Sequence, residues 1–343
     1  MKIALFSTSV PFVRGGYRNI VDWLEIKLRE AGHQVETIYI PQVDDADTLW
    51  QQMAAFRWID LSAADRVICF RPQAHLIQHP HKILWFIHHI RSYYDLWGTP
   101  LSGIDESEKQ IGVRDALRSL DTRAIQESKK VFTNSIVVSD RLKKFNDIDS
   151  EVLYPPILAP ERFVCREYGD EIVYICRMEP HKRQHLLLSA MKHTRSEVRL
   201  RFCGAGSSAY VNELRQFVER ESLSAKVTIT DEWITEEAKV ELLSDCLAAA
   251  YLPVDEDSYG YPSLEASHAR KSVLTTSDSG GVMELVENGV NGYVCDPTPE
   301  SLADAMDRLF LDRPLAKQLG EKASERLDQL NISWTHVLNR LLA

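Results

Sequence analysis

The segment Asp257-Ser-Tyr-Gly-Tyr-Pro-Ser-Leu-Glu265 places two carboxylates around a turn that leads into a helix. Pro262 suits the first helical turn, where its missing N–H costs nothing, and predicts a helix to about His268. Asp257 would precede this helix and Glu265 would lie in its first turn. Free N–H groups at a helix N-terminus bind phosphate, and carboxylates accept hydrogen bonds from hydroxyls. The segment predicts a site for a ligand with both groups, such as a sugar nucleotide.

Each acid also has a structural interpretation. Glu265 could complement the dipole of the predicted helix, and Asp257 could be an ordinary turn residue. The ligand site is favoured because cations and glycines follow other predicted strands of the same chain.

Two of these cations are Arg177 and Lys182, which come just after a predicted strand at 172–176. Arginine offers a planar fork and lysine a point charge, and both bind phosphate oxygens. The pair predicts a diphosphate site, because a departing diphosphate without a metal needs such neutralisation. The alternative is a pair of surface cations beside a turn.

Glycines follow several predicted strands. Gly15-Gly16 would let the backbone approach a ligand at the start of a helix, although the pattern is not G-x-G-x-x-G and an ordinary turn is equally compatible. Cys203-Gly-Ala-Gly206 is interpreted as a structural strand-to-helix turn. Gly280-Gly281 could line a pocket too tight for any side chain.

His88 and His89 end a predicted buried strand at 83–88. Neighbours on a strand face opposite ways, so one of them is expected to reach a site and the other to lie in the core. Arg91, Tyr94 and Asp95 follow closely, so the segment is polar enough to form the wall of a site.

Short apolar runs alternate with amphipathic stretches along the chain, which predicts parallel strands joined by crossover helices. A helix is expected at 18–31, closed by Gly32, and the prolines of Tyr154-Pro-Pro-Ile-Leu-Ala-Pro160 suit a stiff linker. The pattern therefore predicts two doubly wound α/β domains with a boundary near 155–165. Ligands of such sheets bind beyond the carboxyl ends of the strands. The expected strands are 2–7, 34–40, 66–70, 83–88, 130–133, 172–176, 198–203, 226–229, 247–252, 272–276 and 293–295.

Length and charge agree with this organisation. A chain of 343 residues exceeds the usual single core, and a net charge of −10 argues against a nucleic-acid binder, which needs a basic face. The run Arg141-Leu-Lys-Lys144 is a candidate for contact with an anionic membrane surface, or a solvated helix face. Six cysteines without a CxxC pair, no apolar membrane-length stretch and no signal peptide predict a cytoplasmic protein.

Together these motifs resemble the retaining nucleotide-sugar glycosyltransferases of family four, the group 1 glycosyltransferases. That family has the GT-B fold, two Rossmann-like doubly wound domains facing across a cleft. The resemblance covers nearly the whole chain and rests on the ordered set of motifs. They are Gly15-Gly16, His88, Phe132-Thr-Asn-Ser135, Tyr154-Pro-Pro156, Arg177 with Lys182, Asp257, Glu265, Gly280-Gly281-Val-Met-Glu284 and Asn291-Gly292-Tyr293.

The resemblance implies an acceptor-binding domain at 1–160, to which a C-terminal helix at 331–343 crosses back, and a donor-binding domain at 161–330. Within the donor domain it implies that Arg177 and Lys182 bind the diphosphate, that Glu265 binds the ribose and that Asp257 lies against the donor sugar. The residues it assigns to the donor are Gly15, Gly16, Arg177, Lys182, Trp233, Tyr261 and Glu265, and those it assigns to catalysis are His88, Asp257, Arg177 and Lys182.

The chain departs from the family at two positions. Asp257 stands where the family usually has Glu, and Asp231 stands where it tends to have Gly, before Trp233. The shorter side chain would leave the carboxylate about 1.5 Å short. Three outcomes are compatible with this: the loop approaches the donor more closely, Glu256 takes the place of the usual Glu, or turnover is lost. We favour the first, because in an extended segment Glu256 would point to the opposite side from Asp257.

We expect a retaining hexosyltransferase-type enzyme that moves a sugar from a nucleoside diphosphate sugar to an acceptor hydroxyl, in bacterial surface polysaccharide or glycolipid assembly. Its partners would be the donor and a glycan or lipid-linked acceptor, with peripheral contact of the first domain at the inner membrane. No cofactor or metal is expected, although Asp255-Glu-Asp257 resembles a D-x-D metal motif and is the metal-dependent alternative.

Two other functions fit the same motifs: a sugar-nucleotide epimerase on the same fold, and a non-catalytic sugar-nucleotide-binding protein. A nicotinamide oxidoreductase is disfavoured, because no dinucleotide fingerprint follows the first strand.

Overall fold

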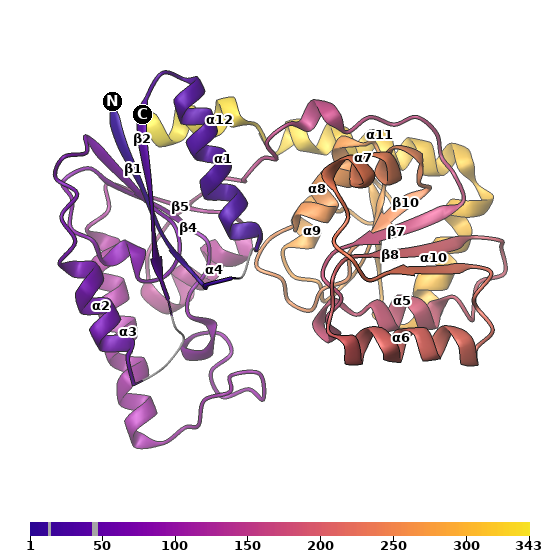
Figure 1. Ribbon diagram of the computed structural model, residues 1–343, viewed down its shortest axis with the longest axis horizontal. Coiled ribbons are helices and arrows are strands. Elements are labelled where there is room, and N and C mark those ends of the chain that lie inside the picture. The colour runs from indigo at the N-terminus through magenta and orange to yellow at the C-terminus, as the bar shows by residue number, and fades with distance from the viewer. Residues whose placement is uncertain (13–14, 43–46) are drawn as a thin grey trace. The chain divides into compact units, whose positions relative to one another are not determined.

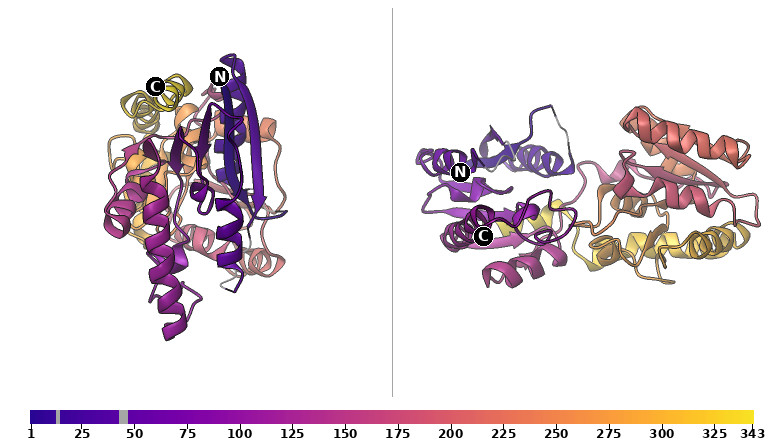
Figure 2. Two further views of the ribbon diagram at one scale, coloured as in Figure 1. Left: turned by 90° about the vertical axis from the view of Figure 1, so that its left-hand side faces the viewer. Right: turned by 90° about the horizontal axis from the view of Figure 1, so that it is seen from below.

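The computed structural model describes residues 1–12, 15–42 and 47–343 (Figure 1). The chain divides into two compact units, the first made of Met1–Pro156 with Ser333–Ala343 and the second of Ile157–Ile332. Each unit contains one six-stranded sheet whose neighbouring strands are parallel, with helices on both faces (Figure 2). The predicted pair of doubly wound α/β sheets is confirmed.

The sheet of the first unit has the strand order β2-β1-β3-β4-β5-β6. Its strands share an apolar cluster with α2, α3 and α4, which includes Phe6, Phe86, Leu117 and Leu142. The elements are β1 Lys2–Ser9, α1 Gly16–Glu30, β2 Gln34–Pro41, α2 Leu49–Arg57, β3 Arg66–Cys69, β4 Lys82–Phe86, α3 Glu108–Gln126, β5 Lys130–Thr133, α4 Ile136–Asn146, β6 Glu151–Val152 and α12 Trp334–Leu342.

Two details of this unit differ from the sequence prediction. Strand β4 ends at Phe86, so His88 and His89 lie in the following loop rather than on the strand. The edge strand β6 was not predicted, because Glu151–Val152 is too short to leave an apolar run.

Helix α12, from the end of the chain, lies in the first unit and packs against α1. Its Arg340 donates to Glu151 of β6 at 2.7 Å, and Lys130 donates to the backbone oxygen of Ala343 at 3.1 Å. These bonds attach the last helix to the edge of the first sheet.

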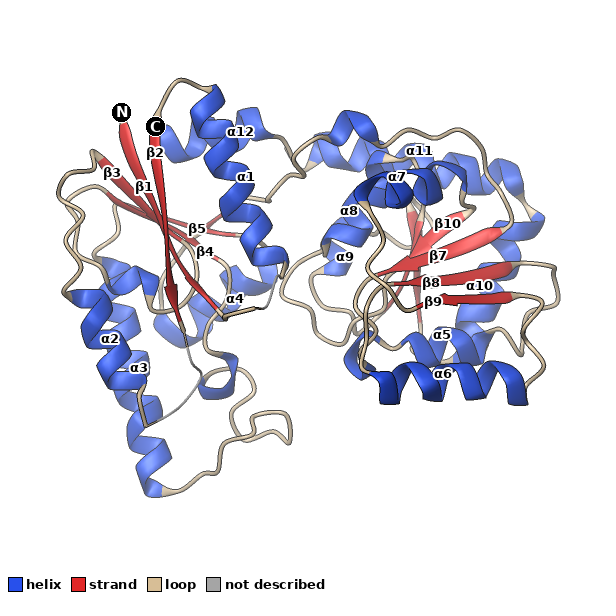
Figure 3. Ribbon diagram, in the orientation of Figure 1, coloured by secondary structure: helices blue, strands red, loops and turns tan. Residues whose placement is uncertain are grey.

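The sheet of the second unit has the order β12-β11-β10-β7-β8-β9. Helix α5 packs on α6 and α10, whereas α8 packs on α9 and α11, and α7 covers β7 (Figure 3). The elements are β7 Glu171–Ile175, α5 Gln184–Ala190, β8 Arg199–Cys203, α6 Ser208–Arg220, β9 Val227–Thr230, α7 Glu236–Asp245, β10 Ala248–Ala250, α8 Tyr261–His268, β11 Val273–Thr276, α9 Val282–Leu285, β12 Gly292–Cys295, α10 Pro299–Leu311 and α11 Arg313–Gln329.

Candidate functional site

The order of the second sheet identifies where a ligand would bind. From β7 the chain continues to β8 and β9 on one side, and β10 then returns to the other side of β7 and leads on to β11 and β12. Ligands of such sheets bind beyond the carboxyl ends of the strands where the order reverses. The segments that follow β7 and β10, residues 176–183 and 251–260, therefore form the candidate site.

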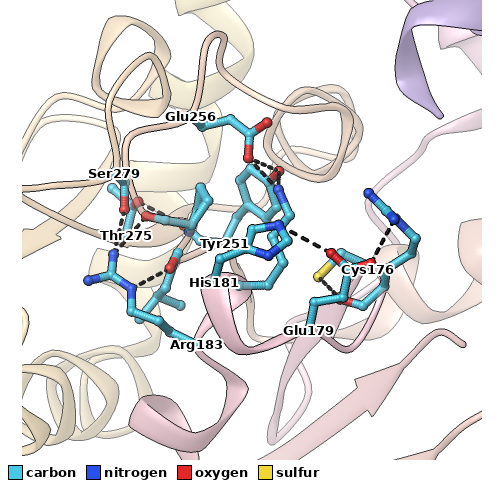
Figure 4. Close-up of polar contacts among 12 residues, drawn as sticks. Cys176, Glu179, His181, Arg183, Tyr251, Glu256, Thr275 and Ser279 are labelled. Carbon is cyan, nitrogen blue, oxygen red and sulfur yellow. Dashed lines mark hydrogen bonds and ion pairs between the residues drawn. The ribbon is translucent and has the colours of Figure 1, made fainter. Parts of the chain in front are cut away.

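Lys182 belongs to the first of these segments, at the end of the short 3₁₀ helix η4 (Pro180–Lys182), and is 8% exposed. Its Nζ donates to the hydroxyl of Tyr251 at 2.9 Å and forms an ion pair with Oε2 of Glu256. The hydroxyl of Tyr251 donates to the same carboxylate oxygen at 3.1 Å (Figure 4). Lys182 is therefore a buried and paired cation.

Arg177 lies between β7 and Lys182 and keeps about half of its side chain exposed, at 51%. Its Nη1 donates to Oε1 of Glu179 at 2.6 Å, and Nε2 of His181 lies 3.2 Å from the other oxygen of that carboxylate. Burial, together with the charge of Lys182, lowers the pKa of His181. Arg177 is the more accessible of the two predicted phosphate-binding cations.

Arg183 is a residue of this region that the sequence analysis missed. Its backbone is left-handed, with φ of 56°, and its guanidinium donates to the backbone oxygens of Leu252 at 2.8 Å and Pro253 at 2.7 Å. It also donates to Thr276 at 2.7 Å and to both oxygens of Asp278 at 2.8 and 2.9 Å. Arg183 thus ties together the chain after β10 and after β11, and no sequence signal distinguishes this role from a surface charge.

The acidic loop after β10 does not follow the extended path that we expected. Asp255 has φ of 46°. Glu256 then forms a β-bridge with Gly280, and the N–H of Gly281 donates to the backbone oxygen of Glu256 at 2.9 Å. A Cβ on Gly280 would overlap that oxygen, and one on Gly281 would lie 2.7 Å from the Cα of Ser258. The glycine pair therefore leaves room for the backbone of the acidic loop.

This bend corrects the expected direction of Glu256, which faces Lys182 instead of pointing away. Asp257 follows it in the same loop and is half-buried. The structure therefore brings Lys182 and the Asp257 loop to the same strand ends.

Helix α8 begins after Gly260, whose φ is 71° and whose missing Cβ makes room for the ring of Tyr251. Tyr261 is its first residue. Glu265 lies in its second turn, whereas the sequence predicted the first turn. Glu265 is 5% exposed, and its Oε1 lies 2.6 Å from Nζ of Lys239 on α7. Burial raises the pKa of Glu265 to about 7, against the charge of Lys239, and burial also raises the pKa of the Tyr261 hydroxyl.

Trp233 lies in the segment between β9 and α7, and its side chain is 70% exposed. Nearby in sequence, Asp231 accepts a hydrogen bond from Arg215 at 2.7 Å. An exposed indole has a free face for stacking, which suits the predicted contact with a nucleobase.

The remaining predicted site residues belong to the first unit. Gly15 precedes α1 with φ of −117°, an extended conformation open to any residue, and Gly16 is the first residue of the helix. Residues 13–14 of the predicted glycine loop lie outside the described residues. His88 is half-buried and its Nδ1 donates to the oxygen of His89 at 2.6 Å.

His89 is 2% exposed, and its Nε2 donates to Oδ1 of Asn146 at 2.8 Å. Burial lowers its pKa to about 4, so the ring is neutral at physiological pH. The two histidines thus differ in exposure, although both lie in the loop after β4 and do not alternate along a strand.

Within residues 1–12, 15–42 and 47–343, no three His, Cys, Asp or Glu side chains are grouped to hold a metal ion. Over the same residues, each helix is too short or too polar to cross a membrane. In the basic run on α4, Arg141 is largely buried beside Asp95 at 3.5 Å, and Lys143 pairs with Asp147 at 2.9 Å.

The match to a known family lies within the second unit. Residues 162–326 match the family model of the glycosyl transferases group 1. Over an alignment of 217 residues, the chain is 24% identical to human alpha-1,3/1,6-mannosyltransferase ALG2, which covers 56% of this chain and 51% of that protein. A 165-residue stretch is 29% identical to the GDP-mannose-dependent alpha-(1-6)-phosphatidylinositol monomannoside mannosyltransferase of Mycobacterium tuberculosis (strain ATCC 25618 / H37Rv), over 45% of this chain and 42% of that protein. The chain thus spans about half the length of these curated relatives.

Among solved structures, Anabaena Alr3699/HepE in complex with UDP-glucose superposes with a TM-score of 0.71 at 16% identity, over 100% of this chain and 98% of that one. At this identity the likeness establishes the fold, which is GT-B.

Proposed function

We propose that this chain, which belongs through its second unit to the group 1 glycosyl transferases, moves a sugar from a nucleoside diphosphate to an acceptor hydroxyl with retention at the anomeric carbon. Glycosyl transfer is the activity of that family, and the donor, stereochemistry and acceptor are the proposal. The observation that supports it is the convergence of Arg177, Lys182 and the Asp257 loop at the point where the strand order of the second sheet reverses.

Each part of the donor has a matching group in the second unit. Arg177 and Lys182 would neutralise the departing diphosphate, in place of a metal. Glu265 would accept hydrogen bonds from the ribose hydroxyls, next to Tyr261 at the start of α8, and Trp233 would stack on the base. Asp257 would contact the donor sugar, whose anomeric carbon gains positive charge as the diphosphate leaves.

The first unit would bind the acceptor. His88, which follows β4 and is half-buried, belongs to this unit, as do Gly15 and Gly16 at the start of α1, which we assign to the donor. The two relatives, a mannosyltransferase and a phosphatidylinositol monomannoside mannosyltransferase, support a glycan or lipid-linked acceptor of the kind used in surface polysaccharide or glycolipid assembly. We propose the cytoplasm as the location, because buried free thiols such as Cys69 and Cys246 are typical of it.

Thermal shift with a panel of nucleoside diphosphates and their sugars, all in chelator, tests the donor part of this proposal. A ligand at about 100 times its dissociation constant adds about 2.7 kcal/mol to the free energy of unfolding, so the cognate base should raise the melting temperature clearly. Arg177→Ala should reduce that rise. A panel without any stabilising nucleotide would contradict the proposal.

Product analysis with the stabilising donor then separates the possible activities. Sugar transferred to an acceptor supports the proposal, a released epimer of the donor sugar supports an epimerase, and bound but unchanged donor supports a binding protein.

A further inference from the structure

One carboxylate oxygen in the candidate site accepts two hydrogen bonds that a phosphate oxygen could accept equally well. Oε2 of Glu256 accepts one hydrogen bond from the ammonium of Lys182 and another from the hydroxyl of Tyr251, at 3.1 Å. Those two donors also contact each other at 2.9 Å, so the three groups form a closed triangle (Figure 4). An ammonium and a hydroxyl that converge on one anionic oxygen are the donors that bind phosphate elsewhere in proteins.

The two donors of this triangle are fixed in place. Tyr251 is 5% exposed, its ring fills the space left by Gly260, and its backbone oxygen accepts from Thr275 at 2.7 Å. The backbone of Lys182 is held by a bond from its N–H to the oxygen of Glu179 at 2.9 Å and by the hydroxyl of Tyr174 on its own oxygen. These bonds anchor the backbones of both donors at the strand ends.

Glu256 is the member that can move. Its side chain is 29% exposed, against 10% for Lys182, while its backbone stays bonded to Gly281. Rotation of the side chain alone would free the oxygen position, because the loop backbone need not shift.

We propose that Oε2 of Glu256 occupies the position of a diphosphate oxygen, and that the donor displaces this carboxylate to bind Lys182 and Tyr251. This rests on the function proposed above and adds two residues to it. Tyr251 is a ligand of the diphosphate, through its hydroxyl. Glu256 is a positioning residue that holds Lys182 in the unliganded protein and competes with the donor.

The proposal predicts opposite effects at two neighbouring residues. Glu256→Gln keeps the shape but loses the charge, so it competes less well and leaves the buried ammonium short of a counter-charge until a phosphate arrives. Nucleoside diphosphate affinity should therefore rise, by about tenfold, and the melting temperature of the unliganded protein should fall. Tyr251→Phe removes one donor and should weaken affinity by about tenfold.

Titration calorimetry of the whole chain in chelator, with pyrophosphate, UDP and GDP as probes, measures both effects. Tyr168→Phe and Glu221→Gln are matched controls in the same unit, because their partners are the oxygen of Arg270 at 2.7 Å and Lys192 at 3.0 Å. Both controls should bind the probes like the wild type. Glu256→Asp, whose shorter side chain withdraws from the ammonium, repeats the test if Glu256→Gln does not fold.

Tighter binding by the Glu256 variants with weaker binding by Tyr251→Phe supports the proposal. Equal or weaker binding after Glu256→Gln, or unchanged binding after Tyr251→Phe, overturns it while the glycosyl transferase proposal stands. Absence of any probe binding in the wild type and in Glu256→Gln would instead contradict the function on which the inference rests.

Discussion

Glu265 of α8 and Lys239 of α7 form a buried ion pair, with 2.6 Å between Oε1 and Nζ. Lys239 also lies 3.0 Å from Glu236, which is half-exposed at the start of α7. The carboxylate that we assign to the donor ribose is thus held by a lysine from the neighbouring helix. Removal of this carboxylate from water raises its pKa, whereas the lysine favours its ionised form.

The first prediction concerns the pH dependence of stability. The folded pKa of Glu265 is about 7, above the ordinary value of 4.5, so between these values the folded protein holds a proton that the unfolded chain releases. The protonated Glu265 side chain therefore contributes to the free energy of unfolding in full below pH 4.5, and this contribution is lost as pH rises through 7. Between pH 5 and 8, the wild type should lose about 2–3 kcal/mol relative to Glu265→Gln. Denaturant unfolding at each pH measures this; parallel curves for the two proteins would contradict it.

The second prediction concerns the two cations. Arg177→Ala and Lys182→Met should each weaken nucleoside diphosphate binding, because charge-assisted bonds contribute about 1.5–3 kcal/mol apiece. Only Lys182→Met should also lower stability, since it leaves Glu256 without its counter-charge. Titration calorimetry and thermal melts check both, with Lys192→Met as the control cation. Unchanged affinity in both variants would remove the phosphate site.

The third prediction separates the two histidines of the first unit. His89→Ala should lower stability by about 2–4 kcal/mol, because it removes a buried ring and its bond to Asn146. His88→Ala should leave stability nearly unchanged and lower turnover by at least about tenfold. Melts and steady-state kinetics are the measurements; a turnover loss confined to His89→Ala would show that the wrong histidine was assigned to the site.

The fourth prediction concerns the shorter acid of the donor loop. Asp257→Ala should lower turnover by about 100-fold with little change in nucleoside diphosphate affinity, because positioning at the sugar affects chemistry more than binding of the diphosphate. Asp255→Ala, on an exposed neighbour, is the control. Comparison of kcat with the calorimetric affinity tests it, and equal kcat for wild type and Asp257→Ala would remove Asp257 from the reaction.

The sequence predicted the sheets well and the side-chain pairs poorly, for a physical reason. The buried parallel strands β7 (Glu171–Ile175) and β10 (Ala248–Ala250) lie in apolar runs, so local composition reveals them. The pairing of Lys182 with Glu256 depends instead on the path of two loops. Asp255 and Arg183 both adopt positive φ; Asp does so more often than most residues, but neither residue type requires that conformation.

The ribose candidate shows the same limit. Glu265 was found from its spacing to Asp257, but its partner Lys239 lies on another helix, 26 residues earlier in the chain. Only the packing of α7 beside α8 brings the two charges together. Sequence spacing therefore singled out the candidate acids and cations, and the fold determines which of them are paired.

The central claim, retaining transfer from a nucleoside diphosphate sugar without a metal, is tested most directly by the anomer first released from the donor. The chain is incubated in chelator with the α-linked sugar nucleotide that stabilises it, water serves as the acceptor, and proton NMR follows the free sugar before mutarotation. The account predicts the α-anomer first, at a rate that falls in Asp257→Ala. Initial release of the β-anomer, or turnover that vanishes in chelator and returns with manganese or magnesium, would contradict it.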